Sequence, residues 1–143
     1  MPYIRVWIHY VWSTKNRELL LTPEIRPRVF DHIRENANKK NIILDSINGY
    51  TDHVHCLISM RRGQTIDKIA QLIKGESSHW INKNELTESR FEWQDEFYAV
   101  SVSESAVNSL RKYILNQEEH HKNVSFNEEY ELLIAGLPKL PGT

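Results

Sequence analysis

Two histidines separated by one residue, His53 and His55, lie in the segment Asp52-His53-Val54-His55-Cys56-Leu57-Ile58. Residues two apart on a β-strand point to the same face, so the two imidazoles would lie side by side while the residues between them enter the core. Two neutral imidazoles suit a divalent metal, which then needs a third oxygen or nitrogen ligand from elsewhere. Seven histidines in 143 residues give roughly 0.3 such pairs by chance, so the pair by itself favours an ordinary solvated strand.

A tyrosine and a glutamine four residues apart, Tyr113 and Gln117, form a second pattern. Positions i and i+4 share one face of a helix, so the phenol and the carboxamide would stand about one turn apart. The plain alternative is a core tyrosine and a solvated glutamine. Chance gives roughly 0.2 such pairs, and roughly 0.06 for both patterns together, so the combination carries more weight than either half. Gln117 can complete a metal site with the two histidines, and the metal can polarise a phosphoryl oxygen while Tyr113 attacks the phosphorus.

The elements that must position these residues alternate between strands and helices. The predicted strands are 4–12, 42–50, 53–60 and 97–102, and the predicted helices are 23–39, 65–83, 103–121 and a short last helix that starts at the capping box Ser125-Phe126-Asn127-Glu128. The order β-α-β-β-α-β-α predicts an α+β fold of the ferredoxin-like (split βαβ) type, with an antiparallel sheet, helices on one face and an added helix that carries Tyr113. We expect the other face of the sheet to stay open to a ligand or partner.

Length and composition predict one domain over residues 1–143, with 40% hydrophobic and 26% charged residues. The single cysteine, Cys56, excludes an intramolecular disulfide and a cysteine-rich zinc site. No apolar run approaches the roughly 20 residues of a membrane helix, so we expect a cytoplasmic protein with no membrane partner. The net charge of −1 argues against bulk-positive coating of nucleic acid, although residues 1–84 carry +5 (13 basic, 8 acidic) and residues 85–143 carry −6 (5 basic, 11 acidic).

In this order the motifs resemble those of the single-tyrosine HUH transposases of insertion sequences and REP-associated tyrosine transposases, where HUH denotes His, a bulky hydrophobe, His. The resemblance covers nearly the whole chain. The similar segments are a first strand with a basic turn, the HUH strand, the second helix, the fourth-strand region and the catalytic helix: Val11-Trp12-Ser13-Thr14-Lys15-Asn16-Arg17, Asp52 to Ser59, Lys74-Gly75-Glu76-Ser77-Ser78, Trp93-Gln94 with Ser101-Val102-Ser103, and Tyr113-Ile114 with Asn116-Gln117 and His120-His121.

This resemblance implies an enzyme that cleaves and rejoins single-stranded DNA at hairpin-flanked sites. His53, His55 and Gln117 would hold Mg²⁺ or Mn²⁺, and Tyr113 would form a 5′-phosphotyrosine while freeing a 3′-hydroxyl. The resemblance also implies a homodimer, often with the tyrosine helix of one subunit completing the site of the other. A host-co-opted relative that acts on genomic palindromes fits the same residues.

The rival from another class is a non-catalytic single-stranded nucleic-acid-binding module, which the fold and the basic half would also suit. It gives no reason for Tyr113 and Gln117 to share a helix face. Trp7, His9 and Tyr10 could stack on bases, whereas His120 and His121 are by default structural or solvated. The candidates for phosphate contacts are basic residues of the first half: Lys15, Arg17, Arg61, Arg62, Lys68 and Lys74.

Overall fold

The chain is described by a computed structural model that covers residues 2–122 and 124–135. Its elements are β1 (Val6–Ser13), the 3-10 helix η1 (Lys15–Arg17), α1 (Arg26–Lys39), β2 (Ile43–Tyr50), β3 (His53–Met60), α2 (Ile66–Lys83), β4 (Tyr98–Val102), the 3-10 helix η2 (Glu104–Ala106), α3 (Val107–Leu115), α4 (Gln117–His120) and α5 (Phe126–Ile134). The strands form one antiparallel sheet in the order β2-β3-β1-β4. Because β3 lies between β1 and β2, this is the predicted ferredoxin-like α+β plan.

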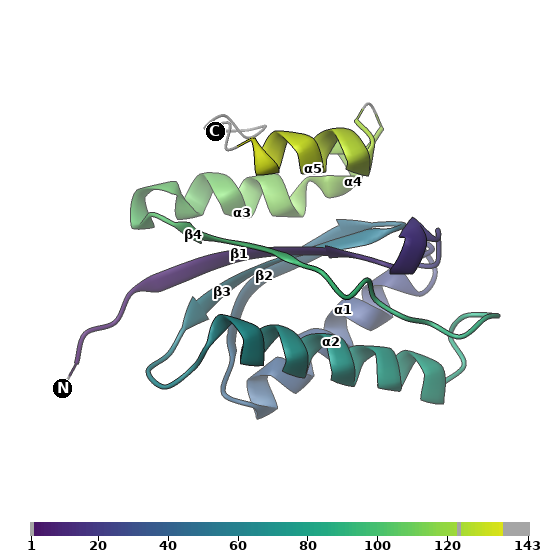
Figure 1. The fold of residues 1–143 in the computed structure, drawn as a ribbon, viewed down its shortest axis with the longest axis horizontal. Helices are drawn as coiled ribbons and strands as arrows, with labels where there is room; N and C mark the ends of the chain where they lie inside the picture. Colours follow the sequence, from purple (N-terminus) through teal and green to yellow (C-terminus); the bar gives the residue numbers. More distant parts are fainter. Residues whose placement is uncertain (1, 123, 136–143) are drawn as a thin grey trace.

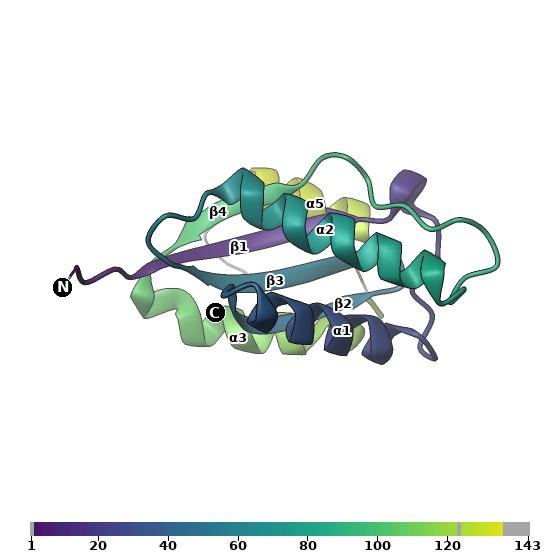
Figure 2. The same ribbon diagram turned by 90° about the horizontal axis from the view of Figure 1, so that it is seen from below.

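Helices cover both faces of the sheet. Figure 1 shows α1 and α2 on one side and α3, α4 and α5 on the other, and Figure 2 shows α1 and α2 crossing the first face. The prediction of an open second face is therefore wrong. The reason is that the segment after β4 folds back over this face as α3, α4 and α5, whose apolar side chains need burial.

Alternate residues of the two central strands fill the larger core, between the sheet and the helices α1 and α2. Alternation along β1 and β3 is as predicted, because each strand sends every second side chain to this face. The residues concerned are Ile8, Tyr10, Trp12, Val54, Cys56 and Ile58, each at most 4% exposed.

The opposite face of the sheet carries two smaller apolar clusters. Trp7 and Leu57 pack against Leu110 and Ile114 of α3. Nearer the other end of β1, Val11 packs against α5, through the buried residues Phe126 and Leu133. Two apolar clusters therefore pack this face of the sheet. The histidines of β3 point into the space between them.

The helix predicted over 103–121 is interrupted in the structure. It consists of η2, α3 and α4, and the break falls at Asn116, whose backbone has φ −98° and ψ 22°. Asparagine is a weak helix former because its side chain competes for backbone hydrogen bonds, which explains the position of the break.

Thr65 begins α2 as predicted, since its hydroxyl accepts a hydrogen bond from the backbone N–H of Lys68 at 3.1 Å. Among the described residues no helix, the 18-residue α2 included, is both long and apolar enough to cross a membrane.

The hairpin between β2 and β3 depends on Gly49. A Cβ atom at this position would lie only 2.2 Å from the backbone oxygen of His53. Glycine therefore permits the close approach of the two strands at the point where the HUH segment begins.

Candidate active site

The histidines of the HUH segment lie on β3 and face the layer of α3, α4 and α5. Both side chains are fully buried, whereas Val54 and Cys56 point into the opposite core. The imidazoles lie side by side as predicted, with ring centroids 5.2 Å apart. The expectation that His53 and His55 occupy a solvent-exposed strand face is wrong, because the last three helices cover them.

Each of these imidazoles has a partner on its Nδ1 side. His53 Nδ1 lies 2.8 Å from Asp52 Oδ1, and His55 Nδ1 lies 2.9 Å from Nε2 of His9. An imidazole engaged in this way turns its Nε2 toward the interior of the site, as metal-binding histidines do. His9 on β1 is 2% exposed, so it orients His55 and is not available for stacking on DNA.

Helices α3 and α4 bring Tyr113 and Gln117 to the histidines of the same chain. The ring centroids of Tyr113 and His55 lie 5.5 Å apart, and Gln117 Oε1 lies 3.0 Å from His53 Nε2. The break at Asn116 keeps both side chains on the same side, and both are buried. The four side chains singled out in the sequence therefore meet within one chain.

A carboxylate that the sequence analysis missed, Glu129 of α5, lies between these four side chains. Its Oε1 lies 3.1 Å from His55 Nε2 and 3.3 Å from His53 Nε2. Its Oε2 accepts hydrogen bonds from the hydroxyl of Tyr113 and from Nε2 of Gln117, the latter at 3.3 Å. Glu129 contacts every predicted catalytic or metal-binding residue.

The position of Glu129 along α5 is the signal that could have found it. Phe126 and Leu133 are the apolar residues that α5 buries, and Glu129 lies between them at helical spacing, three residues after the first. A carboxylate in the middle of a buried stripe needs partners, because an unpaired buried charge is costly.

The neighbouring histidines at the end of α4 also belong to this cluster. His121 Nε2 lies 3.1 Å from Gln117 Oε1 and 3.2 Å from Glu129 Oε1, and its side chain is buried. His120 Nε2 lies 3.1 Å from Glu129 Oε2, without the alignment of a hydrogen bond. The default reading of His120 and His121 as structural or solvated therefore understated their place in the site.

The donor atoms fit a divalent cation. His53 Nε2, His55 Nε2, Gln117 Oε1 and Glu129 Oε1 are two imidazole nitrogens and two oxygens, and the neighbouring pairs are 3.0 to 3.3 Å apart. Atoms that bind a common cation at about 2.1 Å lie roughly 3.0 to 3.4 Å from one another. The set is also one that binds Mg²⁺ or Mn²⁺ through oxygen and imidazole.

Charge states in the site follow from burial and from the neighbouring groups. Burial lowers the pKa of His55, whereas for His53 the hydrogen bonds to Asp52 and Glu129 outweigh burial and raise the pKa. Burial by itself would raise the pKa of Glu129, but His55 and His53 lower it to about 2. At neutral pH the site thus holds a carboxylate beside a neutral His55, both of which are in the form that binds cations.

The helix that carries Tyr113 is fastened to β2 by an ion pair and a hydrogen bond. Arg111 Nε and Nη2 donate to the two carboxylate oxygens of Asp45, at 2.8 and 2.7 Å. Asn48 Nδ2 donates to the backbone oxygen of Leu115 at 3.0 Å. These contacts join α3 to the sheet of its own chain and so hold Tyr113 next to its own HUH strand.

We expect Asp45→Asn to lower the free energy of unfolding at pH 7 by about 0.5–1 kcal/mol, as for a partly exposed bidentate pair. The Arg111 guanidinium holds the pKa of Asp45 below its ordinary value. The stabilisation is therefore complete above the unfolded pKa of about 3.9 and is lost as the pH falls through the lower folded value. Urea denaturation of both proteins between pH 7 and pH 2.5 measures this. A difference that grows on acidification would contradict it, and Asp31→Asn, at an exposed position of α1, is the control.

The predicted phosphate contacts lie on separate elements of the fold. Arg61, Arg62 and Lys68 are exposed at the β3–α2 connection and the start of α2. Lys15 is paired with Glu92 at 3.1 Å on the surface. None of these residues touches the cluster around Glu129 in the described part of the chain, so their role in DNA binding stays a prediction.

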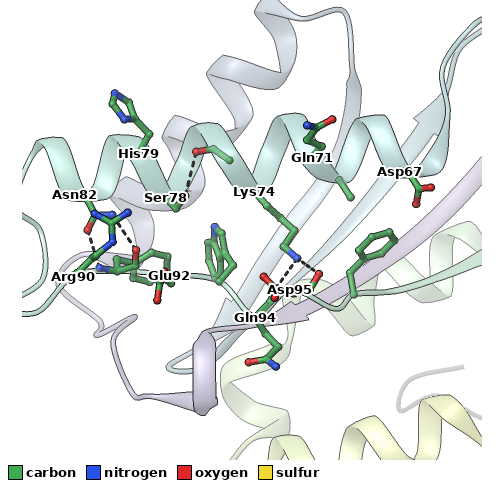
Figure 3. A pocket seen from close by; sticks show the side chains of 15 residues that line it. Asp67, Gln71, Lys74, Ser78, His79, Asn82, Arg90, Glu92, Gln94 and Asp95 are labelled. Carbon is green, nitrogen blue, oxygen red and sulfur yellow. Dashed lines mark hydrogen bonds between the residues drawn. The ribbon is translucent and has the colours of Figure 1, made fainter.

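Lys74 is engaged by its own chain. Its Nζ donates to the backbone oxygens of Gln94 at 2.6 Å and Asp95 at 3.0 Å, as Figure 3 shows. These bonds fasten the segment before β4 to α2, along one wall of a cavity of about 640 Å³. The cavity lies along α2, and none of the residues of the Glu129 cluster lines it. Burial lowers the pKa of Lys74.

Arg17 is the predicted DNA contact nearest to the cluster. Its guanidinium carbon lies 5.1 Å from the ring centroid of Phe126, and that ring stacks on His53 with centroids 4.2 Å apart. Arg17 and Phe126, together with Tyr130 and Phe97, line a groove of about 360 Å³ along α5. A cation and aromatic rings in one groove suit single-stranded nucleic acid.

The chain is similar to known proteins in both sequence and structure. A family model described as "Transposase IS200 like" matches residues 3–117. The ISDra2 transposase TnpA of Deinococcus radiodurans is 26% identical over 116 residues, which are 78% of this chain and 83% of that protein. A crystal structure of a protein assigned as a transposase, from Deinococcus radiodurans R1, has TM-score 0.66 and 23% identity, over 82% of this chain and 95% of that one. A REP-associated tyrosine transposase bound to a REP hairpin has TM-score 0.64 and 16% identity, over 87% of this chain and 73% of that one.

Proposed function

Since the chain belongs to the IS200-like transposase family, we propose that it cleaves and rejoins single-stranded DNA through a covalent bond to Tyr113. The observation that carries this proposal is the meeting of the Tyr113 hydroxyl with His53, His55 and Gln117 around one carboxylate. Among Tyr113, His53, His55 and Gln117, only the tyrosine carries a hydroxyl that can serve as an oxygen nucleophile toward phosphorus.

In the cleavage step Tyr113 Oη attacks the scissile phosphorus. The new P–Oη bond forms a 5′-phosphotyrosine as the P–O3′ bond breaks, the phenol loses its proton, and the 3′ oxygen takes one up. A 3′-hydroxyl later reverses the step and rejoins the DNA. The bond energy is retained in the phosphotyrosine, so the exchange needs no ATP.

His53, His55 and Gln117 are the residues proposed to hold Mg²⁺ or Mn²⁺. The cation supplies Lewis-acid polarisation of a phosphoryl oxygen when it is bound. Asp52 and His9 keep the Nε2 atoms of the two histidines turned inward, and the burial of all these groups excludes water from the reacting atoms.

The partner is proposed to be single-stranded DNA with a hairpin. The structural relative that is described as bound to a REP hairpin supports this, as do Arg17 and the aromatic rings in the groove along α5. The binding-module alternative gives no reason for a buried Tyr113 hydroxyl beside two histidines. Tyr113 lies beside the histidines of its own chain, so one subunit contains all four proposed site residues. The homodimer stays a prediction to be measured by light scattering.

We expect the protein to cut single strands, or hairpins with unpaired flanks, and to leave the fully paired duplex of the same sequence intact. Among the described residues, no α-helix projects from the molecule in a way that would enter a DNA groove, since each one lies along a face of the sheet. Binding should also weaken steeply between about 50 and 200 mM salt, because Lys and Arg contacts release counterions. Equal cleavage of duplex and single strand, measured on denaturing gels, would refute this substrate class.

A further inference from the structure

Glu129 occupies the space between the proposed cation ligands and the proposed nucleophile. One carboxylate oxygen, Oε1, faces His53 and His55, while the other, Oε2, accepts the hydrogen bond of the Tyr113 hydroxyl. A scissile phosphodiester has to bridge the same two partners, because one of its oxygens must be polarised while its phosphorus is attacked. A carboxylate and a phosphodiester both present two oxygens that share one negative charge.

In the described part of the chain, the groups around Glu129 are closed off from solvent, so a phosphate cannot reach them from outside. His53, His55 and Gln117 are 0% exposed, Glu129 is 1% exposed and Tyr113 is 2% exposed. The oxygens and nitrogens around Glu129 are already at hydrogen-bond distance from it. DNA can therefore reach Tyr113 only if the carboxylate leaves.

The attachment of α5 is compatible with such a movement. Within the described residues its apolar anchors are Phe126 and Leu133, which contact Val11 in a small cluster separate from the main core. The groove that contains Arg17 also lies against α5, since Phe126 and Tyr130 of this helix line it. A DNA strand in that groove would lie next to the element that has to move.

We propose that Glu129 is an exchangeable ligand of the cation site, which holds the place of the scissile phosphate until DNA displaces it. This inference rests on the proposed metal-dependent function. It assigns two effects to one side chain: Glu129 strengthens binding of the cation in the absence of DNA, and it competes with the DNA backbone for the cation and for Tyr113.

The test measures Mn²⁺ binding by calorimetry in the absence of DNA, for the wild type, Glu129→Gln, Glu129→Asp, Glu131→Gln and His55→Leu. We expect Glu129→Gln to weaken Mn²⁺ binding at least about tenfold, because outer-shell changes alone cost about 10- to 100-fold. Glu129→Asp keeps the charge but withdraws the carboxylate oxygens from the site, so it should also weaken Mn²⁺ binding. It provides the same test if the Gln variant folds poorly. Glu131 is an exposed glutamate of the same helix, and Glu131→Gln should change nothing.

A second measurement follows the fluorescence anisotropy of a 12-nucleotide oligothymidylate in a Tyr113→Phe background, with and without Glu129→Gln, at Mn²⁺ concentrations that saturate both proteins. Glu129→Gln should bind the oligonucleotide at least about threefold more tightly, because the buried competing anion is gone. Mn²⁺ binding within twofold of the wild type in Glu129→Gln, with loss in His55→Leu, overturns the inference and leaves the proposed function standing. Weaker oligonucleotide binding also overturns it, since Glu129 would then be a permanent ligand. Unchanged Mn²⁺ binding in His55→Leu means instead that the proposed metal site is wrong.

Discussion

Tyr113→Phe is expected to eliminate the covalent protein–DNA adduct while leaving DNA binding intact. A single-stranded hairpin oligonucleotide labelled on the 3′ side of the cut should migrate with the denatured wild-type protein, and label on the 5′ side should not. The reason is that the 5′-phosphotyrosine retains only the downstream fragment once the 3′-hydroxyl fragment diffuses away. Denaturing gel electrophoresis measures this directly.

The substitution keeps the packing of the ring and removes one buried hydroxyl. Glu129 Oε2 then loses one hydrogen-bond donor and retains Gln117 Nε2, so we expect a stability loss of only about 1–2 kcal/mol. Tyr130→Phe is the matched control, because Tyr130 lies on α5 near the same site. An adduct that persists in Tyr113→Phe, or that peptide mapping assigns to Tyr98 or Tyr130, would refute the assignment of the nucleophile.

Chelation of divalent cations with EDTA is expected to abolish cleavage by the wild-type protein, and Mg²⁺ or Mn²⁺ should restore it. We expect about one Mn²⁺ per chain, bound more tightly than Mg²⁺ because imidazole ligands favour the softer ion. Calorimetry gives the stoichiometry, and cleavage of the hairpin oligonucleotide gives the activity. Full cleavage activity in EDTA would refute the metal-dependent mechanism.

The variant that tests the metal site has to preserve the buried volume of the histidine that it replaces. His55 is 0% exposed, so His55→Ala would remove core volume and cost about 2–4 kcal/mol in addition to any loss of metal. His55→Leu fills most of this volume without offering a ligand atom. It should lose both Mn²⁺ binding and cleavage while the far-ultraviolet circular dichroism stays that of the wild type.

The strand order and the positions of His53 and His55 could be predicted from the sequence. Alternation along residues 53–60 places His53 and His55 on one face, and β3 spans the predicted residues. The capping box at Ser125 likewise predicts the start of α5, where the Ser125 side chain accepts from the N–H of Glu128. These features depend on local geometry, because the periods of strands and helices are set by the backbone.

Sequence periodicity could not show which side chains meet across the fold. Glu129 is 74 residues from His55, and Arg111 is 66 residues from Asp45, yet both pairs are in contact. A glutamate in a short amphipathic helix looks the same in a sequence whether it points to solvent or to a cation site. The packing of α5 on the sheet decides its environment.

By itself the sequence determined the ferredoxin-like plan, the histidine pair and the spacing of Tyr113 and Gln117. The tertiary structure alone decided that the site is closed, that Glu129 and His121 belong to it, and that His9 supports His55. The physical reason is that periodicity fixes the face on which a side chain lies, whereas burial and contact depend on which distant element packs against that face.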